Sequence, residues 1–208
     1  SIYKHEGHQV YTMIATDGAK GGAIKGKKLA EQRANEAISG LAKLSPPIFL
    51  NLPDGELGDE LEHKKIVKEN IIRIMPDLII THSENDYHAD HKSLSLITKG
   101  AVSHYIPILY CDTLIGINFN PNYYVDITDH YELKKEAVLN HKTQSPQRFV
   151  DLFQLMNSYR AAQCNAPKGN YAEAYSFMPS FPFSDIREIL PSPLKLRPFH
   201  IKNQHGFL

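Results

Sequence analysis

The feature that most constrains the fold is residues 76–91, where a short apolar run leads directly into a cluster of histidines and carboxylates. The apolar run is Leu78-Ile79-Ile80, and it shows no polar–apolar alternation. Such a run is typical of a strand buried on both faces of a parallel sheet. Open α/β sheets bind ligands beyond the carboxyl ends of their strands. The sequence therefore predicts a functional site in the polar cluster that follows, which contains His82, Glu84, Asp86, His88, Asp90 and His91.

The densest part of this cluster is His88-Ala89-Asp90-His91. If it opens a helix, His88 and His91 lie one turn apart on the same side. They would then serve as two metal ligands, or as one ligand and one catalytic group. Asp90 would be favoured by the positive end of the helix dipole and could orient an imidazole ring. A solvated polar loop is the alternative, and the number of metal-binding and proton-transferring side chains here favours the functional interpretation.

The rest of the chain alternates predicted strands and helices, which is typical of right-handed parallel crossovers. The sequence predicts an α/β fold, Rossmann-like, with a mainly parallel sheet and helices on both faces. The predicted strands are 9–15, 48–52, 77–81, 107–115 and 123–127, and the predicted helices are 28–44, a second that is capped by Asp59 and ended by Pro76, 92–104, 129–141 and 146–163.

Composition excludes several classes of protein. Lysine plus arginine and aspartate plus glutamate are equal at 23 each, which argues against a nucleic-acid partner. No apolar run approaches the roughly 18–20 residues of a membrane span. The two cysteines, Cys111 and Cys164, indicate reduced thiols and a cytoplasmic protein. The 208 residues suit one domain, and the five prolines within residues 178–208 predict a C-terminal arm.

Several short motifs, in order, resemble one family. Residues 77–82 followed by 86–91 are similar to the second motif of the PIG-L/LmbE-like zinc-dependent de-N-acetylases, which act on N-acetylglucosamine-type groups. The other matching segments are Thr16-Asp17-Gly18, Arg33 with Glu36, residues 52–57 (Leu-Pro-Asp-Gly-Glu-Leu), residues 141–144 (His-Lys-Thr-Gln) and residues 171–175 (Tyr-Ala-Glu-Ala-Tyr). The resemblance spans most of the chain up to about residue 177.

The resemblance implies a hydrolase that removes an N-acetyl group from a small amino-sugar substrate. Its cofactor would be Zn²⁺ or another divalent metal such as Fe²⁺, and a homo-oligomer is possible. The implied roles are His91 as a metal ligand, His88 at the developing oxyanion with Asp90 tuning its charge, Arg33 and Asp54 as substrate contacts, and Asp17, His141 and Gln144 as supporting residues. A metal-free family member that binds a sugar or a partner chain is the alternative, and a nucleotide-binding protein is disfavoured because no glycine fingerprint occurs.

The main departure from the family is the absence of its opening His-Pro-Asp-Asp motif, which would supply two further zinc ligands and the general base. We therefore expect that the family's first strand and helix precede these 208 residues. In the family that strand lies inside the sheet, so a groove is expected beside the strand at residues 77–81. Without the motif, these residues alone are expected to bind zinc weakly and to be inactive.

Overall fold

The structure is a computed structural model that describes residues 1–22, 24–102, 105–178 and 190–191. Most of the predicted C-terminal arm at residues 178–208 lies outside the described residues. Among the described helices, none combines the length and the apolar character that crossing a membrane requires.

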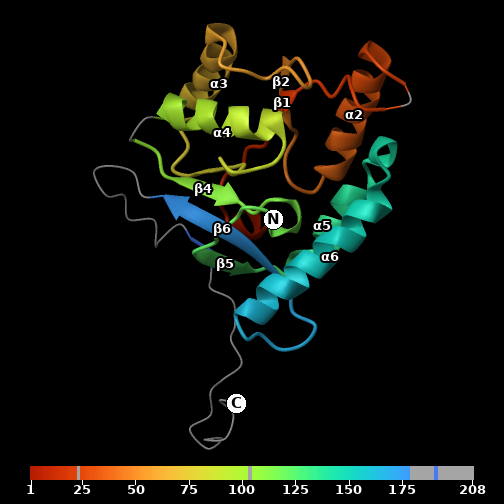
Figure 1. The fold of residues 1–208 in the computed structure, drawn as a ribbon, viewed down its shortest axis with the longest axis vertical. Helices are drawn as coiled ribbons and strands as arrows, with labels where there is room; N and C mark the ends of the chain where they lie inside the picture. The colour runs from red at the N-terminus through yellow and green to blue at the C-terminus, as the bar shows by residue number, and fades with distance from the viewer. Residues whose placement is uncertain (23, 103–104, 179–189, 192–208) are drawn as a thin grey trace, which may run out of the picture.

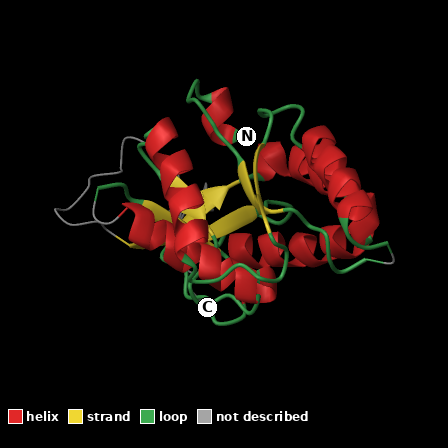
Figure 2. Cartoon of the chain, turned by 90° about the horizontal axis from the view of Figure 1, so that it is seen from above, coloured by secondary structure: helices red, strands yellow, loops and turns green. Residues whose placement is uncertain are grey.

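The fold is α/β, as predicted, and helices lie on opposite sides of the strands (Figure 2). The helices are α1 (Ile2–His5), α2 (Lys27–Gly40), α3 (Leu61–Ile74), α4 (Ala89–Val102), α5 (Tyr131–Leu139) and α6 (Pro146–Gln163). The strands are β1 (Met13–Thr16), β2 (Ile48–Leu52), β3 (Ile79–Thr81), β4 (Ile108–Cys111), β5 (Tyr123–Asp126) and β6 (Ala172–Met178). The described residues also contain three 3₁₀ turns: η1 (Leu114–Gly116), η2 (Thr128–His130) and η3 (Lys142–Gln144).

The strands form two sheets rather than one (Figure 1). β1 pairs in parallel with β2, and a second sheet has the order β3-β4-β6-β5. The pairing of β3 with β4 is parallel, but β6 runs antiparallel to both β4 and β5. The expected parallel character therefore holds among the first four strands, and the late strand β6 reverses it.

A groove separates the two sheets between β1 and β3. It is a cavity of about 590 Å³, and its lining presents both apolar and polar groups. Met13 and Ala15 of β1 line one side, and Ile79 of β3 lines the other. Val67 and Ile71 of α3 form part of its wall, and residues 7–11 also border it. The groove predicted beside the strand at residues 77–81 is confirmed.

The hydrophobic core fixes the direction of the parallel strands. Val67 and Ile71 are one turn apart on α3 and are 1% and 3% exposed, so one stripe of that helix is fully buried. They pack in one cluster with Ile97 of α4 and Ile108 of β4. β2 leads into α3, β3 connects α3 to α4, and β1 pairs in parallel with β2, so the carboxyl ends of these strands point to one side of the molecule.

Candidate functional site

A cavity of about 700 Å³ lies beyond the carboxyl ends of β1 and β2 and beside the amino end of α4. Its lining includes every residue to which the resemblance assigns a role, namely Asp17, Arg33, Asp54, His88, Asp90, His91, His141 and Gln144. These residues come from five separate segments of the chain, so their shared position is a property of the fold. The structure shows where they lie, and their roles stay predictions.

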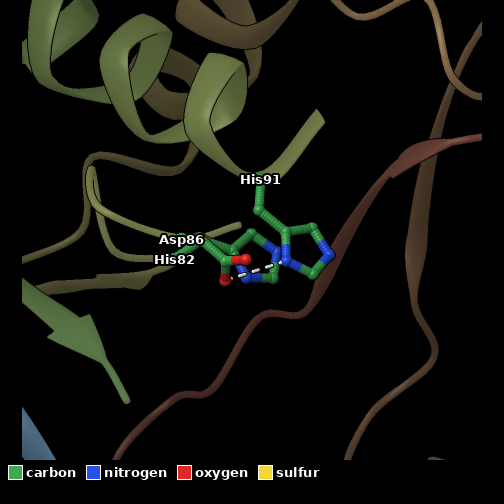
Figure 3. Close-up of side chains that lie close together, drawn as sticks. All are labelled: His82, Asp86 and His91. Carbon is green, nitrogen blue, oxygen red and sulfur yellow. Dashed lines mark hydrogen bonds and ion pairs between the residues drawn. The ribbon is translucent and has the colours of Figure 1, made fainter. Parts of the chain in front are cut away.

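One contact in the site joins the carboxylate of Asp86 to the ring of His91 (Figure 3). Asp86 is 4% exposed, and its Oδ2 lies 3.0 Å from Nδ1 of His91. Its Oδ1 accepts the backbone N–H of His88 at 2.9 Å. Burial raises the pKa of Asp86, but the hydrogen bonds from His88 and His91 more than offset this and hold it below its usual range. The group is therefore a carboxylate, and the proton in the Asp86–His91 bond lies on Nδ1.

The two neighbouring imidazoles consequently have opposite tautomers when neutral. In His91 the proton is on Nδ1, so Nε2 carries the lone pair. In His88 the Nδ1 accepts the backbone N–H of Asp90 at 3.2 Å, so the ring proton is on Nε2. The ring centroids lie 4.6 Å apart. The site thus offers one nitrogen lone pair and one N–H donor side by side.

His82, Asp86 and His91 are a possible metal-binding group, since one donor atom from each lies within 4.8 Å of the others. Two imidazoles and a carboxylate suit Zn²⁺. However, the rings of His82 and His91 are stacked, with centroids 3.9 Å apart and planes at 1°. A metal ion lies in the plane of a ligating ring, so one ion cannot serve two parallel stacked rings. Only one of the two rings can therefore ligate an ion in this arrangement, and His91 is the one that lines the cavity.

His82 is held as a neutral ring. Burial lowers its pKa, the neighbouring His91 lowers it further, and the attraction of Asp86 only partly opposes them, so the value falls to about 4. The sequence placed His82 in the cluster but assigned it no role. Asp86 was also unassigned, although it lies five residues before His91 in the same motif. Its contact with His91 is the signal that only the folded chain provides.

Asp90 has partners that the sequence did not predict. It is 6% exposed, and its carboxylate accepts the backbone N–H groups of Gly55 at 2.8 Å and Leu57 at 3.2 Å. The side chain was expected to tune the charge of His88, yet among the described residues only its backbone N–H reaches that ring. Asp90 therefore joins the first turn of α4 to the turn after β2, and this contact holds the two loops of the cavity together.

Arg33 and Asp54 are also engaged within the protein. Nη1 of Arg33 donates to the carbonyl oxygens of Gly18 and Lys20, both at 2.7 Å, and lies 3.6 Å from Oδ2 of Asp54. That oxygen accepts the backbone N–H of Lys20 at 2.9 Å. Gly18 has φ +68°, and a Cβ there would lie 2.9 Å from the Arg33 side chain, so this close approach requires glycine.

Asp17 completes this network. Its Oδ1 accepts the backbone N–H groups of Ala19 at 3.0 Å and Asp54 at 3.3 Å. The loops after β1 and β2 are thus fixed to each other by carboxylates and one guanidinium. Nε of Arg33 is buried and has no hydrogen-bond partner among the described residues.

Comparison with known proteins points to one family. Residues 1–102 match the family model of PIG-L, described as GlcNAc-PI de-N-acetylase. The diacetylchitobiose deacetylase of Thermococcus kodakarensis is 27% identical, with 83% of this chain and 73% of that protein covered. Among solved structures, the N,N′-diacetylchitobiose deacetylase of Pyrococcus horikoshii has a TM-score of 0.71 at 21% identity. The superposition covers 85% of this chain and 75% of the Pyrococcus chain.

The same fold also occurs in a protein with a different reaction. GalB, the 4-carboxy-2-hydroxymuconate hydratase of Pseudomonas putida, has a TM-score of 0.73 at 16% identity, with 93% of this chain and 90% of its own covered. The fold alone therefore does not fix the chemistry, whereas the family model and the curated relative that match in sequence are both described as deacetylases. Residues 1–102 thus match the PIG-L family model, and this chain is similar to LmbE-like deacetylases in sequence and shares their fold.

Proposed function

We propose that this protein is a metal-dependent hydrolase that removes the N-acetyl group from an N-acetylglucosamine-type sugar or sugar conjugate. The observation that carries the proposal is the pair of ring contacts, Asp86 at Nδ1 of His91 and the backbone N–H of Asp90 at Nδ1 of His88, from which the opposite tautomers follow. Hydrolysis of an amide needs an activated water and a donor for the oxyanion of the tetrahedral intermediate. A lone pair on His91 and an N–H on His88 match these two needs.

His91 would hold the metal ion through Nε2, because Asp86 occupies its Nδ1. When bound, a divalent ion such as Zn²⁺ or Fe²⁺ supplies a polarised carbonyl and a water of lowered pKa. Asp86 fixes the ring in the tautomer that a metal requires, which is the usual function of a carboxylate behind a ligating histidine. Further ligands are expected from the His-Pro-Asp-Asp motif, which these 208 residues do not contain.

His88 would donate its Nε2–H to the oxyanion. Its own orientation is fixed from two sides, since its backbone N–H binds Asp86 and its Nδ1 binds the backbone of Asp90. A preorganised donor of this kind needs no reorientation as charge develops, and is worth about 2.7–4 kcal/mol at the transition state. The sugar would occupy the remainder of the 700 Å³ cavity, where Arg33 and Asp54 present polar atoms.

Both cysteines are free thiols, which supports the cytoplasmic location proposed from the sequence.

The hydratase reaction has less support, because the likeness to GalB is one of fold. A metal-free family member that only binds a sugar or a partner remains the alternative function. It predicts sugar binding without acetate release.

The test compares two adjacent histidines in the full-length protein. We expect His91→Ala to lose bound metal and activity together, because it removes a ligand. We expect His88→Ala to retain the metal and to lose turnover by about 10²–10³, the scale of one oxyanion donor. Metal content and acetate release from N-acetylglucosamine are measured for both. His63→Ala is the control, since His63 lies on α3 outside the cavity and pairs with Glu60, the residue that precedes this helix. Equal metal loss in the two cavity variants would contradict the assigned roles.

A further inference from the structure

Glu36 is a buried carboxylate that the proposed reaction does not use. It lies on α2 and is 8% exposed. Its Oε1 accepts the backbone N–H of Thr143 at 3.0 Å, and its Oε2 accepts the hydroxyl of the same residue at 2.7 Å. Both oxygens of the carboxylate are therefore engaged by a single residue that is 107 positions away in sequence.

Thr143 is the middle residue of η3, the turn that joins α5 to α6. The residues at the two sides of Thr143 that line the cavity are His141 and Gln144. Among the described residues, neither of these side chains has a hydrogen bond or ion pair, whereas the side chains of Arg33 and Asp54 are bonded within the protein. His141 and Gln144 therefore present free polar groups to the cavity from the wall formed by η3.

The packing of α2 against α5 reinforces this arrangement. Gly40 lies one turn after Glu36, and a Cβ at this position would lie 2.8 Å from the carbonyl oxygen of Ala137 and 3.5 Å from Nε2 of His141. The absent side chain lets α2 approach the end of α5 closely. Arg33, one turn before Glu36, holds the loop after β1. One helix thus fixes two walls of the same cavity relative to each other.

The structure assigns Glu36 as a positioning residue whose carboxylate holds η3 so that His141 and Gln144 contact the sugar substrate. This inference rests on the proposed function for the identity of the ligand, and it replaces the supporting role expected for His141 and Gln144 with direct substrate contact. Because these contacts are to the sugar and not to the acetyl group that reacts, they bind substrate and transition state alike. Losing them raises KM and leaves kcat nearly unchanged.

The experiment compares Glu36→Ala and Glu36→Gln with a matched control, Glu136→Ala. Glu136 is an exposed carboxylate on α5 that pairs with Lys43, so it also connects the α2 region to α5, but outside the cavity. Hydrogen exchange of the peptide spanning residues 140–146 reports the position of η3 without any need for activity. Binding of N-acetylglucosamine by titration, and KM and kcat for its deacetylation, report the consequence.

We expect Glu36→Ala to increase exchange in residues 140–146, to weaken N-acetylglucosamine binding and raise KM about tenfold, and to keep kcat within about twofold. Glu36→Gln retains one acceptor and should fall between Glu36→Ala and wild type, and it keeps the test valid if the alanine variant does not fold. Unchanged exchange, or increased exchange with unchanged sugar affinity, overturns the assignment. A wild-type protein that neither binds nor deacetylates N-acetylglucosamine instead overturns the proposed function, and the exchange result still decides whether Glu36 holds η3.

Discussion

The substitution Asp86→Asn tests whether the tautomer of His91 controls the metal site. The carboxylate of Asp86 accepts from two donors, the backbone N–H of His88 and Nδ1–H of His91. An asparagine has only one oxygen, so its NH₂ group must face one of these donors. The backbone N–H cannot change, but an imidazole can move its proton to the other nitrogen. The amide oxygen should therefore remain on His88, and the NH₂ should face His91.

This arrangement forces the proton of His91 onto Nε2 and removes the lone pair that a metal needs. Replacing the carboxylate behind a ligating histidine typically costs 10–100-fold in metal affinity or activity. That range corresponds to about 1.4–2.7 kcal/mol. We expect the metal affinity of Asp86→Asn to fall by this amount while the protein stays folded, because the bond to the His88 backbone is retained.

Two measurements on the full-length protein decide the outcome. Metal affinity is obtained by competition with a chelator, and ring ¹⁵N chemical shifts identify the tautomer of His91. Glu84→Gln is the matched control, since Glu84 lies in the same loop but binds Lys99 and Tyr110 instead of a site histidine. Wild-type metal affinity in Asp86→Asn, or an unchanged His91 tautomer, would refute the reasoning.

Two further predictions concern stability. Gly40→Ala should lower the free energy of unfolding, because overpacking against the backbone of Ala137 costs about 1–3 kcal/mol and exceeds the 0.5–1 kcal/mol that alanine gains in a helix. Gly100→Ala should raise the free energy of unfolding, because a Cβ at Gly100 would have no neighbour within 4 Å. Urea denaturation of the two variants measures both changes. Burial raises the pKa of Glu173, but Lys134 and Tyr175 more than offset this and lower it below 4.5. The unfolded chain then binds the proton more readily, so this contribution to stability is complete above about pH 4.5 and is lost as the pH falls further. Glu173→Gln should lack this component, and a wild-type-minus-variant difference in unfolding free energy that does not shrink between pH 7 and pH 3.5 would contradict it.

The sequence predicted helices and strands well where the spacing of apolar residues and the prolines at the ends of a segment indicate the same element. The strand at 48–52 and the helix at 146–163 have the predicted bounds. The helix expected from residue 92 begins at Ala89, because its first turn is held by Asp90 through contacts with the turn after β2. The antiparallel direction of β6 was not predicted, since a strand pattern carries no information on which neighbour it joins or in which direction.

The site was predicted as a set of residues but not as a set of contacts. Strand order places Asp17, Asp54 and His91 at one cavity, and this much follows from the α/β pattern. Three contacts required the folded chain: Asp86 behind His91, Asp90 on the backbone of Gly55, and Glu36 on Thr143. Each of these contacts joins a charged group to a partner whose position depends on the packing of other elements. The spacing of residues in the sequence therefore does not predict them.

The groove and the cavity have a common geometric origin. Among the described residues, β1 pairs only with β2, and β3 pairs only with β4, so each strand presents an unpaired edge to the groove. Leaving buried amide groups without partners costs about 1–3 kcal/mol each, and an additional strand between β1 and β3 would satisfy them. A parallel strand in this position would end between Asp17, which follows β1, and His82, which follows β3. Its last residues would therefore lie beside His91, at the place where the resemblance expects the His-Pro-Asp-Asp motif to supply the remaining metal ligands and the general base.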